Sequence, residues 1–150
     1  MKLSNNLVAT GKLAIVLTDE NGNIKHSEEV KNLVVDTGLN FIASRMTGTS
    51  ASVMSHMGVG SGTTAAASGD TALQTPLGSR VALTVSGGSA SDNTVTYVAS
   101  FPAGSGTGAV TEAGIFNAST NGTMLCRTVF SVINKAAGDS MTITWTVTVE

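Results

Sequence analysis

Apolar and polar residues alternate one by one along the last ten positions of the chain. The apolar positions are separated by single threonines, and they are Met141, Ile143, Trp145, Val147 and Val149. Because successive side chains of a β-strand point to opposite faces, this period of two predicts a strand with a buried face and a threonine face. Similar alternation recurs at 13–17, 81–85 and 95–101, where β-branched and aromatic residues favour strands.

One segment departs from this period. Leu39, Ile42 and Met46 recur at helical spacing, Asp36 or Thr37 is a candidate N-terminal cap, and a glycine follows at position 48. This combination predicts a short helix near 37–47.

Turn residues divide the rest of the chain into hairpins and loops. The dipeptides Asn21-Gly22 and Asn121-Gly122 are typical of tight β-hairpin turns. Stretches rich in Gly, Ser, Ala and Thr predict loops at 47–52, 61–75, 86–93 and 103–109. The loop at 61–75 exceeds the usual connection of about 4–6 residues, and loops of this length are usually functional or ordered by a partner.

We therefore expect an all-β fold with eight or nine strands, arranged as a two-sheet β-sandwich of jelly-roll type with one short helix. Residues 1–31 are interpreted as an N-terminal β-hairpin or arm, and residues 32–150 as the β-sandwich domain. The alternative is that the hairpin supplies two ordinary strands of the sandwich. The predicted core consists of Leu39, Ile42, Leu83, Val85, Val95, Tyr97, Phe101, Ile115, Phe116, Leu125, Ile143, Trp145 and Val147.

Composition narrows the classes of function. Of the 150 residues only 12% are charged, and the net charge of -2 lacks the basic footprint of a nucleic-acid-binding protein. No apolar run approaches the roughly 20 residues that span a bilayer, and the first residues show no signal peptide. With 41% hydrophobic residues, the chain is also unlike a disordered protein.

The sequence contains no convincing catalytic, cofactor or metal site. The single cysteine, Cys126, is predicted to be a buried structural thiol, because neither His26 nor His56 lies in a catalytic motif. The glycine-rich stretch at 58–63 lacks the lysine of a phosphate-binding loop, so it predicts a strand that runs into a loop. The Gly-Ser-Gly segments at 60–62 and 104–106 do not match the nucleophile elbow of a serine hydrolase.

Two acidic positions have structural interpretations. Glu112 lies within an otherwise apolar strand, so we expect it to pair with Arg80 or Arg127 or to accept backbone amides. The acidic stretch that begins at Asp19 lacks the spacing of a calcium loop and predicts a surface turn.

Trp145 lies on an apolar face, which favours the core over a sugar-stacking platform.

The abundance of neutral Ser, Thr and Gly indicates a surface that packs against other subunits, since dehydrating a hydroxyl group costs less than dehydrating a charge. Self-association as a dimer or trimer would also cover open strand edges. We expect the N-terminal hairpin to make the main contact with a neighbour and the loop at 61–75 to make a secondary one.

Several short segments carry a resemblance to a known family. In chain order they are 32–43, 57–65, 70–73 with Arg80, 101–104, 111–116, 123–130 and 133–135. Their order resembles that of small structural proteins of tailed bacteriophages, which have capsid-decoration and tail- or fibre-associated roles. The resemblance covers about 32–149 and implies a β-sandwich, no enzyme activity and a homo-oligomer on the virion.

We therefore expect a non-enzymatic virion protein, assembled in the host bacterial cytoplasm and needing no cofactor. The first hypothesis is a capsid cement or decoration protein that stabilises the head lattice by binding the major capsid protein. The alternatives are a tail, baseplate or fibre component that binds tail proteins, and a carbohydrate-binding β-sandwich module. No nucleic-acid or membrane partner is expected.

Overall fold

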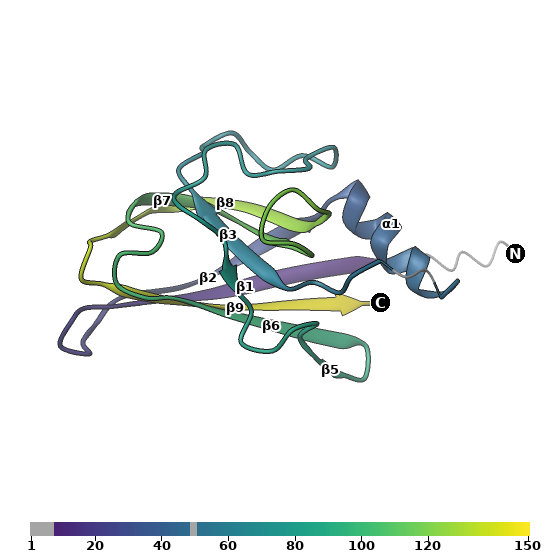
Figure 1. Ribbon diagram of the computed structural model, residues 1–150, viewed down its shortest axis with the longest axis horizontal. Helices are drawn as coiled ribbons and strands as arrows, with labels where there is room; N and C mark the ends of the chain where they lie inside the picture. The colour runs from purple at the N-terminus through teal and green to yellow at the C-terminus, as the bar shows by residue number, and fades with distance from the viewer. Residues whose placement is uncertain (1–7, 49–50) are drawn as a thin grey trace, which may run out of the picture.

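The computed structural model describes residues 8–48 and 51–150 (Figure 1). These residues form nine strands and one short helix: β1 (Ala9–Thr18), β2 (Ile24–Val34), α1 (Asp36–Arg45), β3 (His56–Gly60), β4 (Val81–Ala82), β5 (Ser89–Ser91), β6 (Thr94–Phe101), β7 (Gly108–Phe116), β8 (Met124–Lys135) and β9 (Ser140–Val149). The predicted all-β class and the short helix are both confirmed.

The strands belong to one antiparallel sheet in the order β4-β3-β7-β8-β2-β1-β9-β6-β5. The sheet curls, so that β3, β7 and β8 lie over β1, β9 and β6 (Figure 1). β2 pairs with β1 along most of its length but with β8 only at Leu33 and Val34. The segment that follows β4 also meets β6, because Thr84 N donates a hydrogen bond of 2.8 Å to Val98 O. The two-sheet sandwich of jelly-roll type stays a prediction.

The main core fills the inside of this curl. β1 contributes Leu13, Ile15 and Leu17, and β9 contributes the fully buried Trp145 between Ile143 and Val147. Most of the predicted core residues are buried, namely Leu83, Tyr97, Phe101, Ile115, Phe116, Leu125, Ile143, Trp145 and Val147. Ile42 and Val95 are partly buried against the same cluster.

The prediction that Leu39 belongs to the core is wrong, because its side chain is 44% exposed. The helix lies where it was expected, but its buried side centres on Gly38, whose backbone approaches the carbonyl group of Leu125 too closely for a Cβ atom. Phe41 and Ile42 share that side, whereas Leu39 is turned about 100° away from Gly38. The expected side-chain cap is also absent, since Thr37 donates its hydroxyl hydrogen to Met124 O instead.

The prediction that Val85 belongs to the core is wrong as well, since it is 51% exposed. β4 ends at Ala82, and the chain then enters a turn in which Gly88 N donates to Val85 O. The alternation seen in the sequence therefore continues past the end of the strand.

The N-terminal hairpin is built into the sheet. All ten residues of β1 pair with β9, from Ala9 opposite Val149 to Thr18 opposite Ser140. The predicted boundary at residue 31 falls inside β2, and the division of the chain into an arm and a domain stays a prediction. Residues 1–7 of the predicted arm lie outside the described residues.

Candidate functional site

The loop at 61–75 covers the outer face of β3, β7 and β8, away from the main core (Figure 1). Beneath it lies a second, smaller apolar cluster that Leu73 forms with Val35, Phe116 and Met124. Leu73 is the residue that the loop contributes to this cluster, and hydrogen bonds to Glu112 and Arg127 hold other parts of the loop.

A fully buried ion pair lies on the same outer face. Glu112 on β7 and Arg127 on β8 are each 0% exposed. The Nη2 atom of Arg127 is 2.9 Å from Oε2 of Glu112, and Nε donates to the same oxygen at 3.0 Å. Such charge-assisted pairs are stronger than neutral hydrogen bonds, but removing both charges from water is costly.

The carboxylate of Glu112 also binds both ends of the loop. Its Oε1 atom accepts hydrogen bonds from Gly62 N at 3.0 Å and Thr75 N at 2.8 Å. Its Oε2 atom accepts a third from Gln74 N at 3.1 Å. One side chain therefore fixes the points where the loop leaves β3 and where it returns.

Arg127 holds the middle of the loop. Its Nη1 atom donates to Asp70 Oδ2 at 2.8 Å, and its Nη2 atom donates to Thr64 O at 3.1 Å. Asp70 in turn accepts a hydrogen bond from Ala67 N at 2.9 Å. We call Glu112, Arg127 and Asp70 the loop anchor, because together they bind the start, the middle and the end of the loop.

The surroundings of Glu112 favour its charged form. Burial is the largest single influence and acts to raise the pKa of this carboxyl group. The backbone amides of Thr75, Gln74 and Gly62 and the Arg127 side chain donate to it and act in the opposite direction. The hydrogen bonds outweigh burial, so the pKa of Glu112 lies below its ordinary value.

The glycine-rich stretch at 58–63 leaves room for the Glu112 carboxylate and for the returning loop. A Cβ atom on Gly62 would lie 2.6 Å from Oε1 of Glu112, and one on Gly60 would lie 2.5 Å from Thr75 O. Glycine is therefore required at both positions by the close approach of the carboxylate and of the returning chain. The prediction of a strand that runs into a glycine-rich loop is confirmed, since β3 ends at Gly60.

The outward side of the loop is uncharged. Asp70 is the only charged residue in 61–75, and its carboxylate is paired with Arg127. The remaining exposed positions of the loop are Thr63, Thr64, Ala65, Ala67, Ser68, Gly69, Thr71, Ala72, Gln74 and Thr75. The anchor thus presents a neutral surface of small and hydroxyl-bearing side chains.

The other candidate residues have structural contacts. Of the two arginines considered for Glu112, Arg127 is the partner, whereas Arg80 lies 3.3 Å from the ring centroid of Phe116 and donates to Ala118 O and Asn121 O. Cys126 is buried as predicted, and burial raises the pKa of its thiol.

The histidines and the acidic turn also have local partners. His56 Nδ1 lies 2.8 Å from the hydroxyl oxygen of Ser55, its neighbour in the chain, and His26 Nε2 lies 3.4 Å from Glu28 Oε1. Asp19 accepts the backbone amides of Asn21 and Asn23, each at 2.9 Å, as expected for a surface turn. Across residues 8–48 and 51–150 no group of three potential metal ligands gathers, and no helix is long and apolar enough to cross a membrane.

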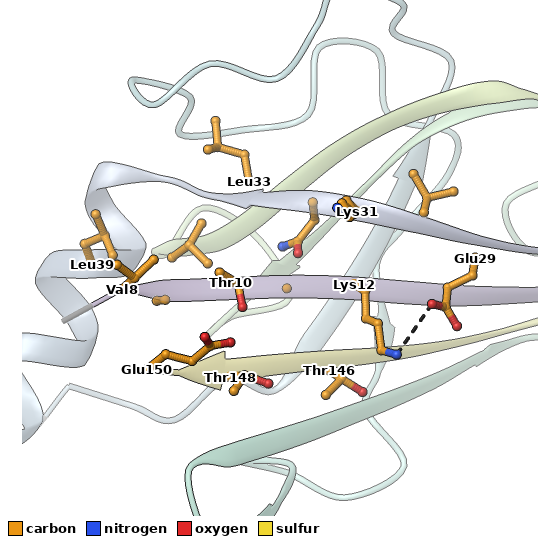
Figure 2. A pocket seen from close by; sticks show the side chains of 15 residues that line it. Val8, Thr10, Lys12, Glu29, Lys31, Leu33, Leu39, Thr146, Thr148 and Glu150 are labelled. Atoms are coloured by element: carbon orange, nitrogen blue, oxygen red, sulfur yellow. Dashed lines mark ion pairs between the residues drawn. The ribbon is translucent and has the colours of Figure 1, made fainter. Parts of the chain in front are cut away.

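A second surface feature is a groove of about 870 Å³ over β1, β2 and β9 (Figure 2). Thr146 and Thr148 line it together with Lys12, which forms an exposed ion pair with Glu29 at 3.4 Å. This is the predicted threonine face of β9, which continues onto β6, where Thr94 lies beside Thr148 with 3.3 Å between the hydroxyl oxygens.

Comparison of the chain with protein-family models, with curated proteins and with solved structures finds no match in any of the three.

Proposed function

We propose that this chain is a non-enzymatic structural protein of a tailed-phage virion, acting on the head as a capsid cement or decoration protein. The observation that carries the proposal is the loop anchor, which binds a long loop with an uncharged outward side at its start, middle and end. Glu112, Arg127 and Asp70 all belong to the segments that resemble small phage structural proteins. The resemblance therefore coincides with the residues that shape this loop.

The energetic character of the anchor supports a docking role for the loop. Transferring two charged side chains from water into a protein costs several kcal/mol per ion, and well-packed apolar residues of similar volume often stabilise a fold equally well. The anchor instead fixes the loop backbone at Gly62, Thr64, Ala67 and Thr75. A loop that is already ordered loses less conformational entropy when it binds a partner.

The neutral surface of the loop suits a protein partner such as the major capsid protein. Hydroxyl and methyl groups are dehydrated at lower cost than charges, and they add no like-charge repulsion when many copies gather on one lattice. β1 and β2 are part of the sheet, so the hairpin offers its tip at 19–23 for contact (Figure 1). The sequence alone ranks the N-terminal hairpin first and the loop second. We propose the reverse order, with the main contact at the loop and a secondary one at this tip, because the loop anchor orders the loop at the surface.

The proposal includes a two-layer sandwich of jelly-roll type and self-association on the virion. The pairing of β2 with both β1 and β8 supports the two-layer arrangement, because β2 links the two halves of the curled sheet. A sugar-binding module is less well supported, since Trp145 is fully buried and unavailable for stacking.

The experiment uses phage particles from which the gene for this chain has been deleted. Purified chain is added back, and bound protein is quantified after the particles are sedimented. Ala65→Lys places a charge on the exposed loop, and the matched control Ala90→Lys places one on β5, where Ala90 is also exposed. We expect loss of binding for Ala65→Lys alone, whereas equal binding of both variants would contradict docking through the loop.

The number of copies per wild-type particle separates the capsid from the tail. A cement protein occupies the lattice in proportion to the major capsid protein, whereas a tail, baseplate or fibre component is present in a few copies. Quantitative mass spectrometry of purified virions measures this ratio, and a few copies per particle would overturn the capsid assignment. Absence of the chain from the virion would overturn the proposal as a whole.

A further inference from the structure

A pocket of about 290 Å³ lies between α1, the start of β6 and the end of β9, at the end of the curled sheet that carries the helix (Figure 1). We call it the α1 pocket. Its walls are mostly apolar and include Phe41 and Ile42 from α1, Val95 from β6 and Val149 from β9. At roughly 30 Å³ for each heavy atom, the share that one water molecule has in the liquid, this volume holds about ten heavy atoms.

Tyr97 on β6 brings a hydroxyl group to the α1 pocket. The residue is only 6% exposed, and among the described residues none accepts a hydrogen bond from its hydroxyl. Buried tyrosine hydroxyls usually have a partner, and phenylalanine would fill the same space without leaving a donor unpaired. The hydroxyl therefore indicates a hydrogen-bond acceptor that comes from outside the described chain.

The ring of Tyr97 is held in place by the turn that forms one wall of the pocket. A Cβ atom on Gly88 would lie 2.7 Å from Cδ1 of Tyr97, so the backbone of Gly88 packs directly on the ring. Burial raises the pKa of Tyr97 to about 12, so the hydroxyl keeps its proton at neutral pH and is able to donate it to a hydrogen bond.

Among the described residues that line the α1 pocket, Arg45 alone is charged. It lies in the last turn of α1, and its guanidinium carbon is 4.6 Å from the centroid of the Phe41 ring, which belongs to the apolar wall. Its charge also reaches the Tyr97 hydroxyl, where it acts to lower the pKa that burial raises. An arginine has five N–H donors, so it can bind a ligand oxygen while it keeps other contacts.

We infer that the α1 pocket binds a small carboxylate with an apolar body, such as a medium-chain fatty acid. The apolar body packs between α1 and the sheet, and the carboxylate accepts hydrogen bonds from Arg45 and from the Tyr97 hydroxyl. An ionised carboxylate carries only acceptors and matches the planar guanidinium group in shape and charge. The inference is independent of the proposed function, because Glu112, Arg127 and Asp70 do not line this pocket.

The first test titrates the full chain with octanoate, whose size fits the volume of the pocket, by isothermal calorimetry. Wild-type chain should bind it. Tyr97→Phe should weaken binding by roughly three- to tenfold, as expected for a neutral hydrogen bond, and Arg45→Gln by roughly tenfold or more. Lys12→Gln is the control for lost charge, since Lys12 is exposed on β1, and it should bind like the wild type.

Thermal unfolding of the same variants separates binding from folding. Tyr97→Phe should melt no lower than the wild type without ligand, because the hydroxyl has no partner to lose among the described residues. Weaker binding at unchanged stability would therefore assign the hydroxyl to the ligand. Wild-type affinity in both Tyr97→Phe and Arg45→Gln would overturn the inference.

The second test varies the ligand and locates it. Octanol keeps the apolar chain without the charge, and acetate keeps the charge without the chain, so both should bind more weakly than octanoate. N-acetyl-leucine presents its carboxylate as the end of a protein chain does; binding tighter than that of octanoate would identify a chain terminus as the source, and weaker binding a free acid. Octanoate should shift amide resonances at 41–45, 87–90 and 95–97 in nuclear magnetic resonance spectra.

Three results of these measurements would also overturn the inference. They are the absence of octanoate binding at millimolar concentration, octanol binding as tight as that of octanoate, and resonance shifts confined to residues outside the α1 pocket.

Discussion

Replacing Glu112 with glutamine tests the loop anchor most directly, because the side chain keeps its shape and loses its charge. Both oxygens of the carboxylate accept hydrogen bonds, Oε1 from Gly62 N and Thr75 N, and Oε2 from Gln74 N and Arg127. An amide group offers one acceptor oxygen and one donating nitrogen. In either orientation, the new NH2 group therefore faces at least two N–H donors.

The expected loss of stability follows from the charge of Arg127, which stays buried in the variant. Breaking a buried ion pair by removing one partner costs about 3–5 kcal/mol, because the other charge is left without full compensation. For a domain of this length each kcal/mol lowers the melting temperature by about 2–4 °C, so Glu112→Gln should lower it by roughly 6–20 °C. Arg127 keeps its ion pair with Asp70, which limits the effect to this range.

The assay combines thermal unfolding with hydrogen exchange. Peptides from 61–75 should exchange faster in Glu112→Gln, whereas peptides from β1 and β9 should keep their protection, since these strands lie in the other part of the sheet. The control is Glu29→Gln, which removes an exposed ion pair with Lys12 that we expect to contribute at most about 1 kcal/mol. A melting temperature close to that of the control, together with unchanged exchange in the loop, would refute the reasoning.

Four further outcomes are expected. Trp145→Ala should lower the free energy of unfolding by about 3–5 kcal/mol in a urea titration, and a variant that melts within a degree or two of wild type would show that Trp145 is not core. Gly62→Ala should loosen the loop in hydrogen exchange because its Cβ atom would lie 2.6 Å from the Glu112 carboxylate, whereas Gly69→Ala, with nothing within 4 Å, should not. Because burial raises the pKa of Cys126, its thiol should resist a disulfide reagent in the native protein and react in urea; rapid native reaction would contradict its burial. Because the pKa of Glu112 is lowered in the folded state, its charge contributes stability that is fully present above the ordinary pKa of 4.5 and is lost as the pH falls through the lowered pKa. In that acidic range, the free energy of unfolding should therefore fall less steeply with decreasing pH in Glu112→Gln than in the wild type.

Local patterns in the sequence were enough to locate most of the elements. The alternation at 141–149 predicted β9 with Trp145 inside, and the turn dipeptide at Asn21-Gly22 predicted the hairpin between β1 and β2. The helix was predicted within two residues of its observed ends. These features depend on backbone geometry over a few residues. The spacing of apolar residues reflects this geometry directly, with a period of two in strands and of 3.6 in helices.

The same patterns misplaced residues at the ends of elements. Leu39 has helical spacing with Ile42, but the face of α1 that is buried was decided by how closely Gly38 can approach Leu125. Val85 continues the alternation of β4, but the strand ends where Leu83 and Thr84 bond to two different segments, at Ser55 and Val98. In both cases, contacts with residues distant in the sequence determine which side chain is buried.

Composition and local patterns show that this chain is rich in strands, weakly charged and contains one unusual acidic residue, Glu112, inside an apolar strand. That Glu112 pairs with Arg127 rather than Arg80 is visible only in the folded chain, as is its binding of loop residues that lie 37 to 50 positions away in the sequence. The order of the strands in the sheet belongs to the same class of facts. Their physical cause is pairing between segments that are distant in the sequence. Which segments meet depends on the twist and curl of the whole sheet, which no local pattern records.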